Sequence, residues 1–291
     1  MKHLLKLYSF ESVHSTPDEE ALANWLADWF KEHNVKVRRI GNNFMKLDKP
    51  CVPILSAHLD QVKTNGKAEH FVLTPEKHIE AYNADWERTS LGGDDKNGVW
   101  IILKMLEENV DINFIISEGE ECGCIGIHAL DRQGLLEDSI KQLQTFCIVL
   151  DRRGGKDVLR SGSGSTYCET LAQDICNYLE DMSVTSGSLS DTATICQYCE
   201  SVNMSVAYEA PHTAMEHTDW NRLQIIKDYV KSLVTDFIHY PTPPSVYCKS
   251  FSSTYYSKGT NYGKTDKNKI KRNNDYDFDY DDWETCWRNY Y

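Results

Sequence analysis

The chain has 291 residues and a formal net charge of −13 at pH 7. Such an acidic composition argues against a nucleic-acid partner, because phosphate groups bind basic surfaces. No run approaches the roughly 18 apolar residues of a membrane span, and the start at Met1–Leu5 turns polar too soon for a signal peptide. We therefore expect a cytoplasmic protein of one large or two small domains, with no membrane partner.

The N-terminal part predicts two helices followed by a β-hairpin. Residues 1–10 have the spacing of a short amphipathic helix. A second helix is expected from the run Ser15–Glu19 to about residue 34, because that run offers a hydroxyl cap, a proline in the first turn and acidic residues at the positive end of the helix dipole. Strands at 35–40 and 44–47 are expected to pair around a glycine–asparagine turn.

A largely apolar run at 52–57 predicts a buried strand that delivers His58 and Asp60 at its C-terminal end. Open α/β sheets place their sites at that edge. The segment that follows is rich in loops and holds two short apolar stretches that we expect to be strands, at 71–73 and 78–82.

Further acidic residues follow a glycine turn and two apolar runs. A glycine pair precedes Asp94 and Asp95, and a helix is predicted from there to about residue 108. The run 112–116 predicts a core strand that leads to the adjacent carboxylates Glu120 and Glu121. Another predicted core strand, at 146–150, ends on Asp151.

Strands and helices continue to alternate toward the C-terminus. We expect helices at 166–179 and 220–237, a helix capped by Ser188–Asp191, and a strand over 202–208 that ends near His212. Because the elements interleave along the chain, the sequence predicts an α/β fold with a largely parallel sheet.

The composition changes after Pro241. A basic cluster there precedes an acidic one, tyrosines are frequent, and aliphatic periodicity is missing. We therefore predict a folded domain over 1–240 and a disordered tail over 241–291. Docking of the tail through its aromatic residues, or its binding to a partner, is the alternative.

Two carboxylates side by side at the end of a buried strand repel one another and lose hydration. A fold tolerates this mainly where a cation or a reacting proton is present. Hydrolysis of a peptide bond needs an activated water, a polarised carbonyl and a proton shuttle, and two divalent ions supply the first two. The histidine, aspartate and glutamate residues found here are the ligand types that bind two such ions, so we expect a metallopeptidase.

The residues divide among the roles that this chemistry needs. His58 follows a core strand as a ligand should, and Asp60 is expected to fold back onto its imidazole. Either aspartate of the pair at 94–95 is able to bridge two ions. Glu120 and Glu121 point in opposite directions on an extended chain, so one can bind metal while the other serves as general base.

Together these residues resemble the di-zinc aminopeptidase and carboxypeptidase superfamily, and peptidase T-like tripeptidases in particular. The similar motifs are a strand-end His-x-Asp, a glycine-flanked Asp-Asp-Lys-x-Gly, Glu-Glu-x-Gly, a strand-end Asp and His-Thr-x-x-Glu, at 58–60, 92–98, 120–123, 151 and 212–216. The resemblance implies a three-layer α/β/α, phosphorylase/hydrolase-like fold with a mixed, mostly parallel sheet.

The resemblance also implies a role for each residue. One zinc ion would be held by His58, Asp94 and Asp151, and the other by Asp94, Glu121 and His212. Glu120 would be the general base and Asp60 would orient His58. The family uses the first aspartate of the pair as the bridge, which favours Asp94 over Asp95.

The chain departs from peptidase T in one respect. Asp151 and His212 are too close in sequence to enclose the lid domain of that group, so we expect a single catalytic domain without a lid, as in bacterial leucyl aminopeptidases. The lid's contribution to oxyanion stabilisation is then lost, and Tyr208 is a candidate to replace it. His217 competes with His212 as ligand.

Several residues have roles that stay open at this stage. Glu118 or Glu216 is expected to hold the free α-amino group of a substrate. The pair Ser190–Asp191 resembles a family motif near the site. The spacing of Cys122 and Cys124, and of Cys196 and Cys199, allows a structural zinc site, although reduced buried cysteines fit better.

The expected function is that of an exopeptidase, an aminopeptidase acting on short peptides such as di- and tripeptides. The alternatives are an amidohydrolase of the same fold, which deacylates N-acyl amino acids or cyclises glutamine, and an inactive relative used for binding. Two divalent ions are expected, and zinc is preferred because imidazole and carboxylate ligands are mixed. The oligomeric state is left open.

Overall fold

A computed structural model describes residues 1–162 and 165–236 of the chain. The tail predicted over 241–291 lies outside the described residues. Within the described part, no helix is long and apolar enough to cross a membrane.

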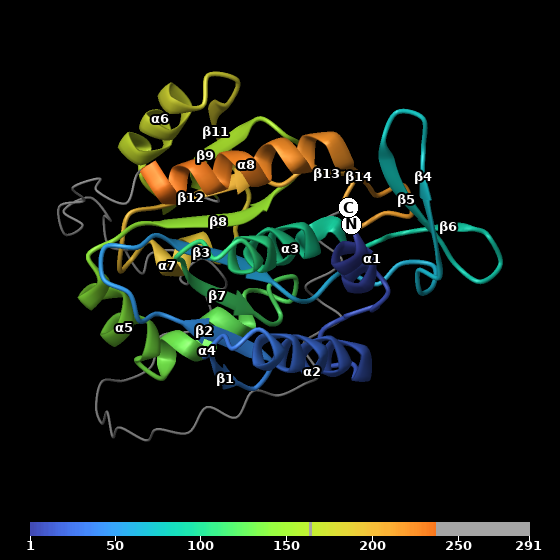
Figure 1. Cartoon of the computed structure of the whole chain (residues 1–291), viewed down its shortest axis with the longest axis horizontal. Coiled ribbons are helices and arrows are strands. Elements are labelled where there is room, and N and C mark those ends of the chain that lie inside the picture. Colours follow the sequence, from blue (N-terminus) through green and yellow to red (C-terminus); the bar gives the residue numbers. More distant parts are fainter. Residues whose placement is uncertain (163–164, 237–291) are drawn as a thin grey trace, which may run out of the picture. The chain divides into compact units, whose positions relative to one another are not determined.

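The main sheet has a parallel centre (Figure 1). Its strands are β1 (Arg38–Ile40), β2 (Asn43–Lys46), β3 (Ile54–His58), β7 (Asn113–Ser117), β8 (Cys147–Arg152), β9 (Asp157–Gly162), β10 (Ser165–Thr166), β11 (Ser183–Gly187) and β12 (Ser201–Ser205). In the described residues the order is β1-β2-β7-β3-β8-β12-β9-β10, with β11 paired to β9. Strands β7, β3, β8 and β12 are parallel, whereas β1, β2 and β9 join antiparallel. The predicted mixed sheet is confirmed.

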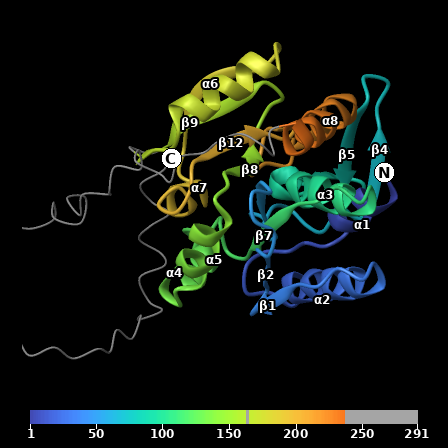
Figure 2. The same cartoon turned by 60° about the vertical axis from the view of Figure 1, so that its left-hand side comes forward.

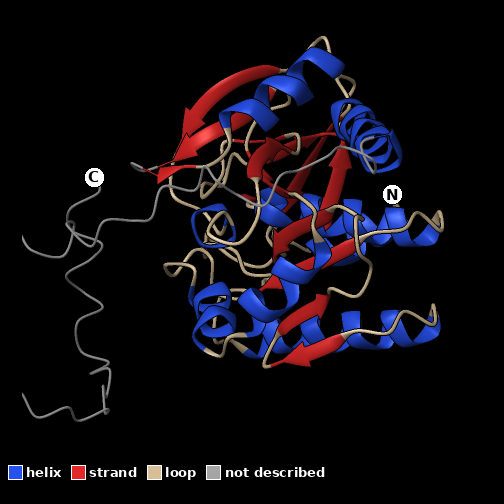
Figure 3. Cartoon of the chain, turned by 90° about the vertical axis from the view of Figure 1, so that its left-hand side faces the viewer, coloured by secondary structure: helices blue, strands red, loops and turns tan. Residues whose placement is uncertain are grey.

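Helices cover both faces of this sheet (Figures 2 and 3). One core holds side chains of α1 (Lys2–Tyr8), α2 (Pro17–Glu32), α3 (Gly93–Glu107), α6 (Glu169–Tyr178) and α8 (Trp220–Asp236), and a second core holds those of α4 (Ile125–Arg132), α5 (Leu135–Leu143) and α7 (Thr192–Ile195). Leu55 and Ala57 of β3 enter the first core and Ile54 enters the second. This alternation explains why the central strands are apolar throughout, and the predicted three-layer α/β/α fold is confirmed.

Local signals near the N-terminus produced the predicted elements. Thr16 caps α2, because its side-chain oxygen accepts a hydrogen bond from the Glu19 N–H at 3.4 Å, and Pro17 occupies the first turn. Strands β1 and β2 form a hairpin in which Ile40 pairs with Asn43. This region could be predicted because the helix cap, the proline and the hairpin turn are all local features of the sequence.

A second, smaller sheet was not predicted. Its strands are β4 (His70–Leu73), β5 (His78–Tyr82), β6 (Arg88–Thr89), β13 (Tyr208–Glu209) and β14 (His217–Asp219). Within the described chain their order is β13-β14-β5-β4, with β6 on β5 (Figure 1). The expected strands at 71–73 and 78–82 are present, and β5 pairs with β14 so that Ile79 faces Thr218. This pairing fixes the hairpin whose loop contains His212.

Some elements differ from the prediction. Helix α5 and strand β11 were not expected. Asp191 precedes α7 but its side chain makes no capping hydrogen bond. Its carboxylate accepts a hydrogen bond from the Ser117 hydroxyl instead. The segment between Asp151 and His212 forms β9–β13, α6 and α7, and its described elements join or cover the main sheet, except β13, which joins the small sheet; none of them builds a lid.

A buried tyrosine joins α1 to the strands and helix that carry the site residues. The Tyr8 hydroxyl donates to Asn97 Oδ1 at 2.5 Å and lies 2.9 Å from Thr218 Oγ1. Asn97 in turn donates to the Val206 carbonyl at 2.8 Å. Helices α1 and α3 and strand β14 are thus linked through polar groups that water does not reach.

Removing that hydroxyl should destabilise the domain. We expect Tyr8→Phe to lower the free energy of unfolding by about 1–2 kcal/mol, because a buried acceptor loses its donor. Urea unfolding with an unchanged m-value measures this loss. Tyr82→Phe is the control, since the Tyr82 hydroxyl donates to the Glu80 carboxylate in a part-buried setting. Equal losses in both variants would contradict the assignment.

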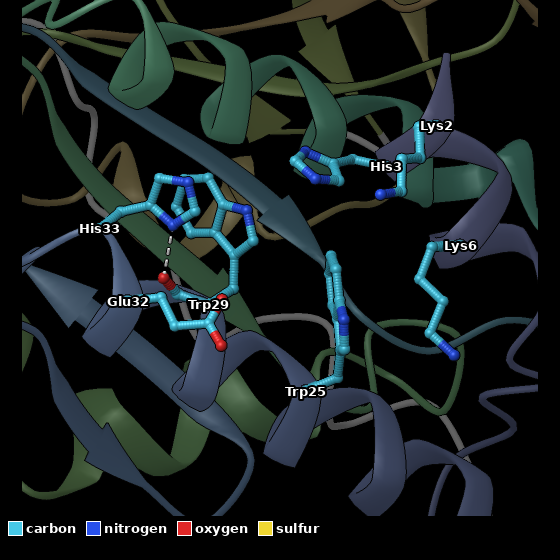
Figure 4. A pocket seen from close by; sticks show the side chains of 7 residues that line it. All are labelled: Lys2, His3, Lys6, Trp25, Trp29, Glu32 and His33. Carbon is cyan, nitrogen blue, oxygen red and sulfur yellow. Dashed lines mark hydrogen bonds between the residues drawn. The ribbon is translucent and has the colours of Figure 1, made fainter.

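A hollow of about 510 Å³ is lined by side chains of α1 and α2, and by His33 just after α2 (Figure 4). His3 of α1 lies edge-on to Trp25 and Trp29 of α2 there, and Lys2 and Lys6 also line the hollow. None of the residues that line it belongs to the predicted site. The candidate site therefore lies elsewhere, and it is defined by its polar side chains.

Candidate metal centre

The predicted site residues meet at the C-terminal edge of three adjacent parallel strands. Strand β3 ends on His58, β8 carries Asp151 next to its last residue, and β7 leads into the turn that holds Glu120 and Glu121. Helix α3 begins at the same edge and presents Asp94 in its first turn. Parallel strands place their C-terminal ends together, so residues distant in sequence become neighbours here.

A glycine allows α3 to approach this edge closely. A Cβ atom on Gly98 would lie 2.4 Å from the Leu150 carbonyl oxygen and 2.6 Å from Asp95 Oδ1. Neither neighbour is the flexible end of an exposed side chain, so a larger residue would push the start of α3 away from β8. Gly98 therefore sets the separation between the Asp94 turn and Asp151.

The two carboxylate oxygens of Asp94 face different histidines. Asp94 Oδ1 lies 3.2 Å from His58 Nε2. Asp94 Oδ2 lies 3.3 Å from His212 Nε2. One carboxylate is thus shared between two imidazoles that come from opposite ends of the domain, which is the arrangement that a bridging ligand requires.

Two more carboxylates complete this arrangement. Asp151 Oδ1 lies 3.5 Å from His58 Nε2, and Glu121 Oε1 lies 2.7 Å from His212 Nε2. The result is two groups of residues, His58–Asp94–Asp151 and Asp94–Glu121–His212. Within each group, the possible ligand atoms lie within 4.8 Å of one another. A third group, His58–Glu120–Glu121, brings Glu120 to the same place.

The electrostatics of the centre favour bound positive charge. Burial raises the pKa of Asp151 to about 7 and also raises the pKa of Glu121. Burial lowers the pKa of an imidazole, but hydrogen bonds with Asp94 and Glu121 outweigh it at His212 and raise that pKa to about 10. The carboxylates are therefore costly to ionise alone and strongly stabilise a neighbouring cation.

These residues fit divalent metal ions. Each of the two groups offers two carboxylates and one imidazole, so the ligand atoms are mainly oxygen atoms that become anionic when a cation is bound. Imidazole nitrogen and carboxylate oxygen are the ligand types of catalytic zinc sites. A divalent cation would offset the repulsion that burial makes expensive. The described residues thus provide a candidate site for divalent metal.

Asp60 contacts more than the histidine. His58 Nδ1 lies 3.0 Å from the Asp60 carbonyl oxygen and 3.4 Å from its carboxylate, so the predicted imidazole contact is made mainly by the carbonyl. The carboxylate accepts hydrogen bonds from the N–H groups of Glu120, at 2.9 Å, and Glu121, at 3.1 Å. Asp60 therefore holds the glutamate turn, a role that was not predicted.

Asp95 faces the backbone rather than the histidines. Its carboxylate accepts a hydrogen bond from the His58 N–H at 3.2 Å and another from the Gly98 N–H at 3.1 Å. It is completely buried. This geometry leaves Asp94 as the member of the pair that faces both imidazoles.

The two glutamates expected to bind a substrate amino group have other partners. Glu118 accepts hydrogen bonds from the Asn42 N–H at 3.3 Å and from Asn43 Nδ2 at 2.8 Å. Glu216 is buried and accepts hydrogen bonds from the backbone of the Asp94 turn. Because Glu216 is buried and bound to that turn, it is not available to a substrate ammonium group, whereas the role of the half-buried Glu118 stays a prediction.

Tyr208 and His217 also differ from the roles considered for them. The Tyr208 hydroxyl donates to Asp151 Oδ1 at 3.3 Å, which uses the proton that an oxyanion would need. His217 Nδ1 lies 3.2 Å from the Met215 carbonyl oxygen, and its ring contacts that of His78. His212, not His217, therefore lies with the carboxylates. Among the described residues, no group of metal-ligand type contains a cysteine.

Comparison with known proteins adds the fold class. No protein-family model and no curated protein matches the sequence. Solved structures of aminopeptidases, however, share the fold, which confirms the predicted class at the level of architecture. Because the sequence identities are below 20%, this similarity shows a shared fold and nothing finer.

Three of these structures illustrate the likeness. The aminopeptidase PepT from Bacillus cereus is 15% identical, with a TM-score of 0.63, and the match covers 80% of this chain and 96% of that one. A tripeptidase from Staphylococcus aureus is 15% identical at a TM-score of 0.64, covering 82% and 97%. A leucine aminopeptidase precursor from Bacteroides thetaiotaomicron is 18% identical at a TM-score of 0.55, covering 80% and 93%.

Proposed function

We propose that this chain is a metal-dependent aminopeptidase that removes the N-terminal residue from short peptides. The observation that carries the proposal is the Asp94 carboxylate, whose two oxygens lie 3.2 Å from His58 and 3.3 Å from His212. We assign the activity to a catalytic domain over 1–240. The aminopeptidase and tripeptidase named above, which have the same fold, support the choice of reaction.

Two divalent ions, most suitably zinc, would be held by the two groups that share Asp94. His58 and Asp151 would complete one set, and Glu121 and His212 the other. When bound, such ions polarise a peptide carbonyl and lower the pKa of water. The chain's own contribution is to fix the ligands through strand ends and buried hydrogen bonds, so that little reorganisation is needed.

Glu120 is the proposed general base. Its carboxylate lies among the ligands, within the group that also contains His58 and Glu121. Its N–H is held by Asp60, which fixes the turn. Burial raises the pKa of Glu120 well above its usual value, which makes the carboxylate a stronger proton acceptor. It would take a proton from the attacking water and give it to the leaving amine.

A mixed panel of free and N-acetylated di- and tripeptides tests the proposal. With zinc-loaded protein, mass spectrometry should detect loss of N-terminal residues from the free peptides only, because the acetyl group removes the terminal ammonium. A chelator should abolish cleavage and added zinc should restore it.

Other outcomes of this panel would contradict an aminopeptidase. Equal cleavage of free and acetylated peptides would exclude recognition of the N-terminus. Release of acetate alone would indicate a deacylase, and cyclisation of an N-terminal glutamine would indicate a cyclase. A protein that binds metal but turns over none of the peptides would be a binding relative.

A further inference from the structure

Glu216 is a buried carboxylate with three hydrogen-bond donors. Its side chain accepts hydrogen bonds from the Gly92 N–H at 2.9 Å, the Asp94 N–H at 3.0 Å and the Ser90 hydroxyl. The residue is 1% exposed. Because the carboxylate is buried, its hydrogen-bond partners are the Ser90 hydroxyl and the backbone of the turn around Asp94 rather than solvent.

Glu216 also belongs to the loop that carries His212. Strands β13 and β14 pair as an antiparallel hairpin, with Glu209 opposite His217. His212 lies in the intervening loop, and Glu216 is the last residue before β14. The same carboxylate therefore connects the turn of one proposed ligand to the loop of another.

We infer that Glu216 is a positioning residue that sets the distance between Asp94 and His212. The inference rests on the proposed metal function and deepens it. The histidine loop enters the site from a hairpin on the small sheet, and Asp94 enters from the start of α3. Among the contacts described above, Glu216 binds the Asp94 backbone directly, so its loss would let the two segments shift apart.

The exposed parts of the loop show why such a tie is needed. The His212 side chain is 46% exposed, whereas those of Asp94 and Glu121 are 10% and 11% exposed. His212 also has a positive φ of 62°, a conformation that non-glycine residues seldom adopt. Packing alone thus constrains this ligand weakly. The Thr213 hydroxyl donates a hydrogen bond to the Ala210 carbonyl within the loop, and the hydrogen bonds of Glu216 are those that tie the loop to the Asp94 turn.

Two variants separate position from charge. Glu216→Gln keeps the length of the side chain but replaces one acceptor oxygen by an NH₂ group that cannot accept an N–H. Glu216→Asp keeps the charge but is one methylene shorter, so it cannot reach the same donors. Glu209→Gln is the matched control, because Glu209 is an exposed glutamate on the same hairpin.

The experiment is a calorimetric titration of metal-free protein with zinc chloride. Changes to residues that orient ligands typically cost 10–100-fold in metal affinity. We expect both Glu216→Gln and Glu216→Asp to weaken zinc binding by about tenfold or more, and Glu209→Gln to bind as the wild type does. Because Asp94 belongs to both ligand groups, both binding events should weaken.

Thermal unfolding of the metal-free proteins provides the second readout. A purely structural role would lower the melting temperature of the metal-free variants and leave zinc affinity intact, which would overturn the inference. Wild-type affinity in Glu216→Asp with weak binding in Glu216→Gln would show that charge alone matters, and it would overturn the inference as well. If Glu216→Gln does not fold, the milder Glu216→Asp decides.

Failure of the inference and failure of the proposed function give different results. A wild-type chain that binds no zinc refutes the proposed function, and the inference with it. A wild-type chain that binds zinc and cleaves free peptides, beside variants that bind zinc equally well, refutes only the role of Glu216.

Discussion

Glu120→Gln is expected to lower kcat by about 10²–10⁴-fold while leaving zinc binding and melting temperature close to those of the wild type. The substitution preserves the shape of the side chain and removes only its ability to accept a proton. The Glu120 N–H remains bound to Asp60, so the turn that also carries Glu121 should keep its geometry.

Steady-state kinetics on a free tripeptide, with metal content measured on the same sample, tests this expectation. Cys124→Ser is a useful control, because the Cys124 thiol is the nearby side chain that contacts Glu120, at 3.8 Å. That variant should retain most of the activity. A Glu120→Gln protein with wild-type kcat would exclude Glu120 as the base, and one that has lost its metal would make it a ligand.

Asp94→Ala is expected to remove both metal ions and all measurable peptidase activity. Among the described residues, Asp94 is the one that belongs to both proposed ligand groups, so its loss leaves each group incomplete. The stabilisation that zinc gives to the folded state should vanish at the same time, because a ligand raises stability only where it binds the native state.

Zinc content by elemental analysis and melting curves with and without zinc measure these effects. Asp85→Ala is the control, since Asp85 is an exposed aspartate outside both ligand groups. His212→Ala should be less severe, because it affects only one group. Retention of both ions in Asp94→Ala would contradict a bridging role.

The parts of the fold that the sequence predicted are those with local signals. Apolar runs predicted β3, β7 and β8, and the hydroxyl cap followed by Pro17 predicted the start of α2. Strand β11 was not predicted, because its residues are exposed or half-buried and do not alternate between apolar and polar. Helix α5 lacks a side-chain cap at its N-terminus, so the usual start signal is missing.

The small sheet was beyond prediction for a different reason. Strands β5 and β14 lie far apart in the sequence, and β14 is too short to show a pattern of its own. Pairing of this kind depends on tertiary contacts, since a short strand alone gains too little to be specified by its sequence.

At the site, residue types at strand ends predicted which side chains gather, whereas hydrogen-bond partners were not predictable. Asp60, Asp95 and Glu216 each accept a backbone N–H from the segment of another site residue. Such contacts depend on loop geometry that no local pattern encodes. Within the run Ser188–Asp191 that was expected to cap α7, the Ser190 hydroxyl accepts the Thr192 N–H at 3.3 Å, whereas the Asp191 carboxylate accepts a hydrogen bond from Ser117 of a neighbouring strand.

The pairing of β14 with β5 also governs when the centre is complete during synthesis. His58, Asp94, Glu121 and Asp151 leave the ribosome first, because translation proceeds from the N-terminus. His212 follows late, and its hairpin needs β5, which was made long before, as its partner. A growing chain therefore holds four of the five proposed ligands and only one complete group, until His212 is added. If the proposed function holds, the chain can therefore cleave peptides near the ribosome only after nearly all of the described domain has been synthesised.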